Sequence, residues 1–323
     1  MKFGLMSDLH LDIMHDGPDR LNQFLKACQE EQVDFIINNG DFCYPKDTSK
    51  CLCSEEGTPV NLKNAMRVST PIPKLQMLAK FNQYPKPHYH VLGNHEMDFC
   101  SKEEAMELYG MPGAYYDFHE NGWHFLVLDP NHFQNEKGEI CDYHYGNYFD
   151  YRDKLPFLDE GQLQWMKRVI MECPEPVVMF SHQPLIPMWG GLKNSDRFQQ
   201  ALDEMGEEHR QKVKMCVYGH VHLDDVSEDR GIIQYSINSM SNYWIGEEYA
   251  RHRYSDDIEE KFPNLQYVFP YQDSLFAIVT MDADGVTIKG KEGQFVAPAP
   301  KETGFYDIDL TASVKDRYVK WPR

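Results

Sequence analysis

Short apolar segments that alternate with helical patterns run through the first 240 residues of the chain. These segments are rich in Val, Ile, Phe and Tyr, as strands are, and they cover residues 2–7, 33–38, 88–92, 123–128, 177–180, 214–218 and 232–237. Helices are expected between them, over residues 20–31, 73–82, 102–108, 159–173 and 196–209. This alternation of strand and helix predicts an α/β architecture.

The chain changes character after about residue 262. Apolar and polar residues alternate over residues 275–281 and 286–291, on either side of Asp282-Ala283-Asp284-Gly285. An Asp-Gly pair between two such segments predicts a β-hairpin, and a hairpin alone is only marginally stable. We therefore expect a main domain over residues 1–261 and a β-rich extension over residues 262–323 that packs on it. Two long loops are expected at residues 43–71 and 131–154.

The charge of the chain argues against several classes of partner. Its 32 basic and 51 acidic residues give a formal net charge of −19, whereas nucleic acid and anionic lipid are bound by clustered Lys and Arg. No apolar run approaches the ~20 residues that a membrane span needs, and the N-terminal apolar run is too short for a signal peptide. We expect a cytoplasmic protein whose eight cysteines, including Cys51 and Cys53, are free thiols.

Five short polar motifs each follow one of the expected strands. They are Asp8-Leu9-His10, Gly40-Asp41, Gly93-Asn94-His95-Glu96, Ser181-His182 and Gly219-His220-Val221-His222. The carboxyl ends of strands are where open α/β sheets place their ligands. Each motif alone is common in proteins without such a site, but all five in this order predict a functional site.

The motifs offer seven oxygen and nitrogen donors, which are too many for one cation and suit two cations that share a ligand. These donors are Asp8, His10, Asp41, Asn94, His182, His220 and His222. A carboxylate is able to bridge two metal ions, and Asp41 is the candidate for this bridge. Nitrogen and oxygen donors without thiolate favour Mn, Fe or Zn.

The spacing within two motifs predicts that their side chains share one direction. Residues i and i+2 of an extended segment point to the same side, so Asp8 and His10 should face the site together. The same argument applies to His220 and His222. Glycines at positions 40, 93 and 219 let the chain turn sharply and approach the site closely.

The set of motifs resembles the pattern of the calcineurin-like metallophosphoesterase superfamily. That pattern is Asp-x-His, Gly-Asp, Gly-Asn-His-Asp/Glu, a later His and then Gly-His-x-His, and here it covers residues 8–222. The segment Leu158-Asp159-Glu160-Gly161-Gln162-Leu163-Gln164-Trp165-Met166 is also similar to a helix of the cyclic-nucleotide-phosphodiesterase-like branch. The resemblance implies a four-layer α-β-β-α sandwich of two mixed β-sheets flanked by helices, to which the C-terminal hairpin is added.

The resemblance also implies a role for each residue of the motifs. It assigns Asp8, His10 and His222 to one metal ion, it assigns Asn94, His182 and His220 to the other, and it makes Asp41 the bridge. His95 is implied to be catalytic, near the phosphate and the leaving group, and not a metal ligand. Glu96 is implied to support the ligands, and the pair Asn38-Asn39 stands where the family often has a small hydroxyl residue.

The implied function is hydrolysis of a phosphodiester or pyrophosphate bond in a small nucleotide-like substrate, by a hydroxide that bridges two Mn, Fe or Zn ions. The Asp-Arg-Gly element of the family's protein phosphatases is missing after Asp41, where Phe42-Cys43-Tyr44-Pro45 stands, and this argues against a protein substrate. A phosphomonoesterase on the same site and an inactive binding scaffold are the alternatives. Because the chain keeps every ligand and His95, the scaffold is disfavoured.

Several residues outside the motifs are candidates for substrate contacts. Aromatic side chains and histidines of the loop 131–154 are suited to stacking on a base, although a plain surface loop explains them equally well; they are His132, Tyr143, His144, Tyr145 and Tyr148. Asn238, Ser239 and Asn242 follow a strand, as binding residues often do. His88 and His90 alternate within a strand and are interpreted as structural.

Overall fold

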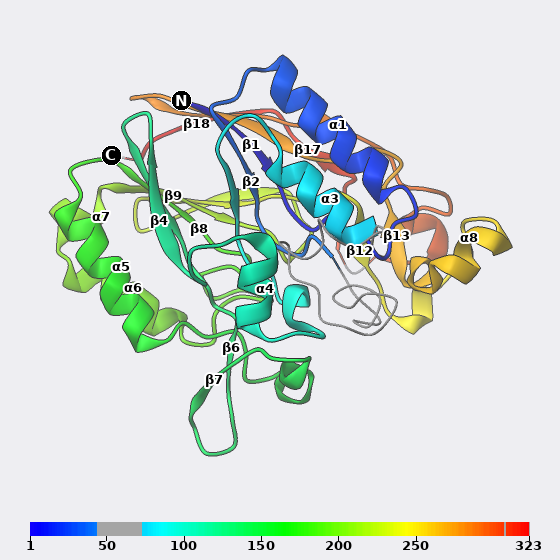
Figure 1. Ribbon diagram of the computed structural model, residues 1–323, viewed down its shortest axis with the longest axis horizontal. Helices are drawn as coiled ribbons and strands as arrows, with labels where there is room; N and C mark the ends of the chain where they lie inside the picture. The colour runs from blue at the N-terminus through cyan, green and yellow to red at the C-terminus, as the bar shows by residue number, and fades with distance from the viewer. Residues whose placement is uncertain (44–72, 307, 323) are drawn as a thin grey trace.

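Two six-stranded β-sheets with helices on their outer faces form the body of the protein (Figure 1). The computed structural model describes residues 1–43, 73–306 and 308–322. Cys51, Cys53 and nearly all of the loop expected at residues 43–71 lie outside these ranges. None of the described helices is long and apolar enough to cross a membrane.

The first sheet joins both ends of the chain. Its order is β18-β15-β14-β1-β2-β3. The strands β1 (Lys2–Met6), β2 (Phe35–Asn38) and β3 (His88–His90) are parallel, and β14 (Ala277–Met281) pairs antiparallel with β1. The strands β15 (Gly285–Lys289) and β18 (Arg317–Lys320) extend the sheet in antiparallel fashion. The predicted hairpin is therefore present, and it pairs directly with the N-terminal strand. The division of the chain near residue 261 stays a prediction.

The second sheet is also mixed. Its order is β10-β11-β9-β8-β5-β4. The four central strands β5 (Trp123–Val127), β8 (Val177–Phe180), β9 (Val213–Tyr218) and β11 (Ile232–Ser236) are parallel. The edge strands β4 (Tyr116–Glu120) and β10 (Asp225–Asp229) are antiparallel to their neighbours. The sequence pattern did not reveal these two edge strands, because both have exposed or half-buried polar positions.

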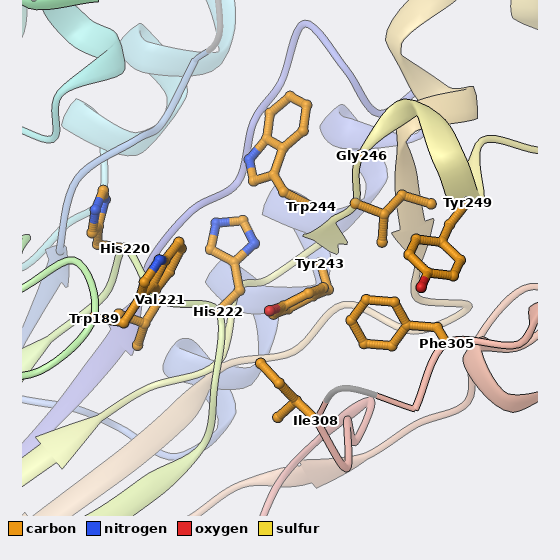
Figure 2. A pocket seen from close by; sticks show the side chains of 11 residues that line it. Trp189, His220, Val221, His222, Tyr243, Trp244, Gly246, Tyr249, Phe305 and Ile308 are labelled. Carbon is orange, nitrogen blue, oxygen red and sulfur yellow. The ribbon is translucent and has the colours of Figure 1, made fainter. Parts of the chain in front are cut away.

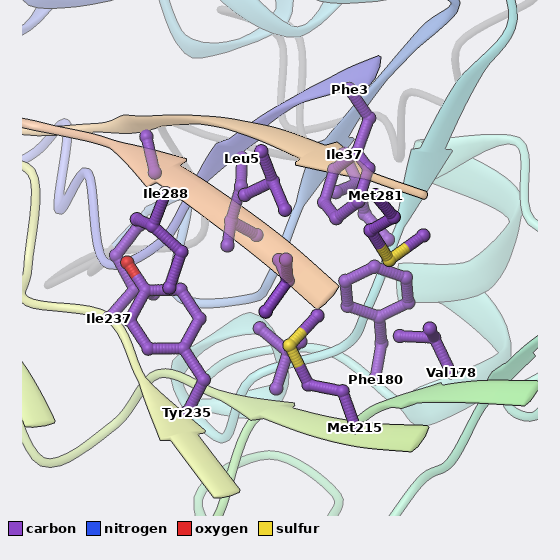
Figure 3. Close-up of a cluster of buried hydrophobic side chains, with 14 of the residues drawn as sticks. Phe3, Leu5, Ile37, Val178, Phe180, Met215, Tyr235, Ile237, Met281 and Ile288 are labelled. Carbon is purple, nitrogen blue, oxygen red and sulfur yellow. The ribbon is translucent and has the colours of Figure 1, made fainter. Parts of the chain in front are cut away.

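The two sheets pack face to face through a continuous apolar core (Figure 3). Leu5 and Ile37 from the first sheet meet Val178, Phe180 and Met215 from the second. Such burial of apolar side chains is the main force that holds the layers together. It explains why the strands contain so few polar residues before their carboxyl ends.

Helices cover the outer face of each sheet, so the predicted four-layer sandwich is confirmed. The helices α1 (Gly17–Glu30) and α3 (Pro73–Asn82) lie on the first sheet, where Leu21, Phe24 and Phe81 pack with Ile36 of β2. The helices α5 (Glu160–Glu172) and α6 (Ser195–Glu204) cover the second sheet. Asp159 caps α5, because its side chain accepts a hydrogen bond from the Gln162 backbone N–H.

Two expectations for secondary structure are wrong in detail. The helix expected over residues 196–209 breaks after α6 at Gly206, whose φ of +80° does not suit a helix, and a short helix α7 (Glu207–Arg210) follows. The loop expected at residues 131–154 contains a hairpin of β6 (His132–Gln134) and β7 (Ile140–Asp142) and a 3₁₀-helix η3 (Asn147–Tyr151). Its polar and aromatic residues did not show the alternation that predicts strands.

The remaining elements are short. They are the 3₁₀-helices η2 (His95–Met97), η4 (Glu247–Tyr249), η5 (Pro263–Tyr267) and η6 (Pro300–Thr303), the helices α4 (Lys102–Tyr109) and α8 (Asp256–Lys261), and the strands β12 (Asn242–Trp244), β13 (Val268–Pro270), β16 (Lys291–Glu292) and β17 (Ser313–Val314). All five polar motifs follow parallel strands, namely β1, β2 and β3 in the first sheet and β8 and β9 in the second. Their side chains therefore come together at one end of the sandwich.

Candidate metal centre

Six side chains of the motifs gather in two clusters beyond these strand ends. One cluster holds Asp8, His10 and His222, and the other holds Asp41, His182 and His220; within each, the donor atoms all lie within 4.8 Å of one another. In the first cluster His222 Nε2 lies 3.1 Å from Asp8 Oδ1 and 3.2 Å from His10 Nε2. Each cluster therefore offers a converging set of nitrogen and oxygen atoms.

The carboxylates of Asp8 and Asp41 each lie close to histidines of both clusters. Asp41 Oδ2 is 3.1 Å from His182 Nε2 in its own cluster and 4.0 Å from His10 Nε2 in the other. Asp8 Oδ1 is 3.8 Å from both His10 Nε2 and His182 Nε2. The clusters are thus adjacent, and Asp41 has the position that a bridging ligand needs.

Five of these residues have a left-handed backbone, which is uncommon outside glycine. The φ angle is +55° at Asp8, +48° at His10, +51° at Asp41, +64° at His220 and +53° at His222. The prediction that the Asp-x-His and His-x-His segments are extended is therefore wrong. Both side chains of each pair reach the site because the chain turns at each of them. Strained backbone of this kind gathers at functional sites, where the surrounding structure holds it in place.

Backbone carbonyls orient two of the histidines. His182 Nδ1 lies 2.8 Å from the carbonyl oxygen of Asn39, and His222 Nδ1 lies 2.6 Å from that of Asn242. A carbonyl oxygen only accepts, so each Nδ1 donates and each Nε2 faces the cluster. Asn39 stands where the family often has a small hydroxyl residue. Its main-chain carbonyl oxygen nevertheless orients the ring of His182.

Two glycines allow the motifs to approach one another. A Cβ atom on Gly93 would lie 2.2 Å from Asp41 Oδ1, and a Cβ atom on Gly40 would lie 2.5 Å from His182 Nδ1. Gly40 also has a φ of +97°, which an L side chain rarely adopts. No larger residue fits at either position without moving a cluster side chain.

The clusters combine charged carboxylates with imidazoles that differ in their protonation. Burial alone would raise the pKa of Asp8, but His222 and His182 outweigh it and bring that pKa to about 2. Burial lowers the pKa of His10 and of His220 to about 3, so both rings are neutral at pH 7, as a metal ligand must be. Asp41 and Asp8 overcome the effect of burial at His182 and raise its pKa to about 10. A proton and a cation therefore compete for that side chain.

The buried carboxylate of Glu96 ties the second motif to the third. It accepts hydrogen bonds from the backbone N–H groups of Asp41, Phe42 and Gly93, at 2.9, 2.8 and 2.6 Å. The Tyr109 hydroxyl donates a fourth, at 3.2 Å. Burial, with the nearby charge of Asp41, raises the pKa of Glu96 to about 7. Glu96 does not point its oxygens at the clusters; it fixes the loops that carry them.

His95 belongs to a separate hydrogen-bonded chain. Its Nδ1 lies 2.8 Å from Asp98 Oδ2, and the hydroxyl of Tyr148 donates to Asp98 Oδ1. Asn94 Nδ2 in turn donates to Tyr148 Oη at 3.4 Å. Burial lowers the pKa of His95, but Asp98 and Asp41 outweigh it and raise that pKa to about 9. Asp98 was not predicted from the sequence. Its spacing of three residues after His95, at which side chains eclipse in a 3₁₀ turn, was the available signal.

Two cavities adjoin the clusters. The first, which we call the aromatic cavity, has a volume of about 400 Å³ and is lined by His222, Tyr243, Trp244, Tyr249 and Phe305, among others (Figure 2). The second, the cationic cavity, has a volume of about 480 Å³ and is lined by Asn94, His95, Tyr148, Arg152 and Lys193, among others. Trp189, which is 73% exposed, and His220 line both. The clusters therefore lie where two separate cavities meet.

The structure separates the other candidates for substrate contacts. Of the five in the segment 131–154, Tyr143 and Tyr148 line the cationic cavity, while His132, His144 and Tyr145 line neither described cavity. Asn238, Ser239 and Asn242 are fully buried and line neither. Ser239 Oγ instead donates to the carbonyl oxygen of Asp8 at 2.8 Å, so it supports the first motif.

Of the two histidines of β3 that were predicted to be structural, His90 has clear structural contacts. His90 is buried between Asn82 Oδ1, 2.7 Å from its Nε2, and Asn38 Nδ2, 3.3 Å from its Nδ1. A neutral ring with the proton on Nε2 satisfies both neighbours. Burial lowers the pKa of His90 to about 3.

Two further groups of acidic residues and histidines lie away from the clusters. Asp129, His132 and Asp142 surround the ammonium group of Lys102, whose Nζ lies 2.6 Å from Asp129 Oδ2 and 2.5 Å from Asp142 Oδ1. That ammonium group already supplies the positive charge there. Asp117, His119 and His124 form a partly exposed group on β4 and β5.

The comparisons with known proteins agree with this fold and site. Residues 1–224 match the family model of the calcineurin-like phosphoesterases. Because this match covers more than half of the chain, the chain belongs to that family. It is a metal-dependent phosphoric ester hydrolase.

Two relatives are informative in more detail. A manganese-dependent ADP-ribose/CDP-alcohol diphosphatase of Arabidopsis thaliana is 25% identical over 235 residues, which cover 60% of this chain and 66%, slightly less than two thirds, of the relative. The crystal structure of a dimetal phosphatase from Danio rerio superimposes with a TM-score of 0.57 at 16% identity, over 92% of this chain and 98% of the other. The second likeness supports the fold alone.

The donor atoms fit metal ions. The side-chain Oδ1 of Asn94 is buried and has no hydrogen-bond partner among the described residues, although a buried amide oxygen normally has one. The converging atoms of the two clusters are imidazole nitrogens and carboxylate oxygens, the set that suits first-row divalent ions. Six of the seven predicted ligands thus lie in the two clusters, and the assignment of each to a metal ion stays a prediction.

Proposed function

We propose that this protein is a dinuclear phosphoesterase that hydrolyses a pyrophosphate bond in a small nucleotide-like substrate. The observation that carries the proposal is the position of the Asp41 carboxylate, which faces His182 of one cluster and His10 of the other. We assign Asp8, His10 and His222 to the first metal ion, and Asn94, His182 and His220 to the second. Asp41 bridges them. The activity of the plant relative, a manganese-dependent ADP-ribose/CDP-alcohol diphosphatase, supports this substrate class.

The metal ions, when bound, would neutralise the phosphate oxygens and make a nucleophile available from water near pH 7. The protein prepares for this with fixed donors. Carbonyl oxygens hold the rings of His182 and His222, and the Glu96 carboxylate holds the two loops that carry Asp41 and Asn94. Preorganised ligands of this kind need no rearrangement when a substrate arrives.

His95 supplies the proton chemistry. Its ring lines the cationic cavity, and the pKa of about 9 keeps it protonated near pH 7. Asp98 holds the ring through Nδ1, which leaves Nε2 as the donor to an oxygen of the substrate. Tyr148 holds Asp98 from the other side. His95 is therefore placed to stabilise or protonate the leaving oxygen.

The aromatic cavity supports a nucleotide-like substrate. The side chains of Tyr243, Trp244 and Phe305 stand around a space that opens beside His222 (Figure 2). Aromatic walls bind a planar base by stacking. The base-stacking role considered for the segment 131–154 thus has a better candidate in residues 243–249 and Phe305, which lie far apart in the sequence.

The first experiment is elemental analysis of protein purified without chelator, together with hydrolysis assays in added Mn²⁺. The substrates are ADP-ribose, cyclic nucleotides, bis-(p-nitrophenyl) phosphate and mono-(p-nitrophenyl) phosphate. About two transition-metal ions per chain and turnover of ADP-ribose are expected. Turnover of the monoester alone would overturn the substrate class and favour a phosphomonoesterase. No metal and no turnover would favour the binding scaffold.

A further inference from the structure

A pair of uncommitted cations stands beside His95 in an otherwise acidic protein. Arg152 and Lys193 are both exposed and both line the cationic cavity. Neither forms an ion pair with another residue in the part of the chain that the structure describes. Although the chain has 51 acidic residues, no Asp or Glu is among the described residues that line either cavity. This end of the site therefore favours an anion more than the net charge of −19 suggests.

The guanidinium group of Arg152 and the backbone of Lys193 are each held by neighbouring residues. The guanidinium carbon of Arg152 lies 5.3 Å from the centre of the Phe149 ring, over its face. The Lys193 backbone N–H donates to the carbonyl oxygen of Pro156 at 2.9 Å. Asn194 forms two hydrogen bonds with Leu158. The Leu158 backbone N–H donates to Asn194 Oδ1 at 3.1 Å, and Asn194 Nδ2 donates to the Leu158 carbonyl oxygen at 2.7 Å. The segments that carry Arg152 and Lys193 are thus pinned together.

We infer that Arg152 and Lys193 bind the leaving phosphate of a diphosphate substrate and make the enzyme prefer pyrophosphate bonds to simple diesters. The inference rests on the proposed function and adds the orientation of the substrate. Its nucleoside end lies in the aromatic cavity, its scissile phosphate lies at the metal clusters, and its second phosphate lies in the cationic cavity.

The position of His95 indicates which cavity receives the leaving phosphate. His95 lines the cationic cavity and not the aromatic one, and it is the group placed to meet the leaving oxygen. In the hydrolysis of a diphosphate, the oxygen of water forms a bond to one phosphorus, and the bond from that phosphorus to the bridging oxygen breaks. The electron pair stays with the leaving phosphate monoester, and the protons of water pass to the products or the solvent. The charge that develops there lies where Arg152 and Lys193 would neutralise it.

Other substrate classes give these cations nothing to bind. A cyclic nucleotide or a bis-aryl diester has one phosphate, which the metal clusters hold. A phosphomonoester has no second phosphate either. Two cations beyond His95 are explained only when the group that leaves is itself charged.

The test compares the double variant Arg152→Gln/Lys193→Gln with the parent chain in Mn²⁺. We expect kcat/KM for ADP-ribose to fall about tenfold or more for each cation removed, and kcat/KM for bis-(p-nitrophenyl) phosphate to change less than about threefold. Arg152→Lys should recover part of the loss, since it keeps the charge without the planar fork. The control Lys137→Gln/Arg168→Gln removes the same charge from exposed positions that line neither cavity.

Each other outcome is decisive. An equal fall on both substrates, or no fall on either, would overturn the inference. If the parent chain cleaved neither substrate, the proposed function would fail on its own. Calorimetric binding of inorganic pyrophosphate to the Mn²⁺-loaded protein would then decide the inference, because equal affinity in the parent chain and the double variant would overturn it.

Discussion

The carboxylate of Glu96 accepts a hydrogen bond from the backbone N–H of Asp41 at 2.9 Å, across 55 positions of sequence. Conversely, the side chain of Asp41 accepts a hydrogen bond at Oδ1 from the backbone N–H of His95, at 2.9 Å. Two motifs from neighbouring strands are therefore locked to each other before any ion binds. Glu96 is not a proposed ligand, but its hydrogen bond makes it important for the position of Asp41, the proposed bridge.

Replacement of Glu96 by Gln should weaken metal binding while leaving all the proposed ligands in the chain. Glutamine has one acceptor oxygen in place of two and adds an amide donor, and it would face three backbone N–H groups. We expect the affinity for Mn²⁺ to fall about 10–100-fold, as removal of supporting groups does. Calorimetric titration with Mn²⁺ measures this.

A matched control is available on α4, where Glu103 is exposed. Glu103→Gln makes the same chemical change and should leave Mn²⁺ affinity unaltered. Tyr109→Phe removes only one donor to Glu96 and should have a smaller effect than Glu96→Gln. An unaltered affinity in Glu96→Gln would show that the lock has no bearing on the metal ions.

Replacement of His95 by Ala should lower turnover without loss of metal. The ring is expected to serve the leaving oxygen, and general acid catalysis contributes about 10²–10⁴-fold. The backbone N–H of residue 95, which holds Asp41 Oδ1, remains in the variant. Turnover of bis-(p-nitrophenyl) phosphate and elemental analysis are measured on the same sample.

The partner of His95 provides the second half of that test. Asp98→Asn keeps the shape of the side chain but removes the charge beside Nδ1, so turnover should fall by less than in His95→Ala. The exposed His144, replaced by Ala, serves as the control. A loss of metal that parallels the loss of turnover in His95→Ala would identify His95 as a ligand and overturn its assignment.

The fold was predictable from sequence because its strands are buried on both faces. Each central strand is a nearly continuous apolar run, and burial in a two-sheet sandwich requires such a run. The same property revealed where the polar motifs begin, since Asp8 and Asp41 interrupt that pattern within a few residues of β1 and β2. The edge strands β4 and β10 were missed because one face of each is not covered in this way.

The cavities were not predictable, because their walls come from distant parts of the chain. Trp189 follows β8, Trp244 lies in β12 and Phe305 lies near the C-terminal end, and no periodic pattern links them. The left-handed backbone at His10 and His222 also had no signal, because this conformation is uncommon for every residue except glycine. The order of the motifs therefore predicted which side chains meet, while the turns that bring them together appeared only in three dimensions.

Replacement of Asp41 by Asn should weaken the binding of both metal ions. Asp41 Oδ2 lies 3.1 Å from His182 Nε2 and 4.0 Å from His10 Nε2, so its charge serves both clusters. An amide keeps the shape but loses the negative charge that a bridging ligand supplies. The metal content after dialysis against buffer with a low, fixed concentration of Mn²⁺ should fall toward zero.

The control for this variant is Asp203→Asn, which removes one carboxylate from the helix α6 and should leave the metal content unchanged. Retention of two tightly bound ions in Asp41→Asn would exclude Asp41 as the bridge. Loss of one ion only would place it in a single cluster.

His90 should make the protein less stable as the pH falls. Burial lowers the pKa of His90 in the folded chain to about 3, compared with 6.5 for the ordinary side chain. Between those two values the unfolded chain binds a proton that the folded chain does not, so the free energy of unfolding falls as the pH drops below about 6.5. One such group contributes a slope of up to about 1.4 kcal/mol per pH unit.

Replacement of His90 by Gln removes this proton and keeps a donor and an acceptor between Asn82 and Asn38. The variant should be less stable than the parent chain at pH 8, because the ring packs against Phe81 at 4.7 Å and Tyr109 at 5.1 Å between ring centres. Its stability should nevertheless fall less steeply between pH 6.5 and pH 5, a range that lies below the ordinary histidine pKa. Thermal unfolding in saturating Mn²⁺ measures both effects. His88→Gln, which makes the same substitution on the same strand, is the matched control. Parallel curves for His90→Gln and the parent chain would mean that His90 takes up its proton in the folded state, contrary to its burial.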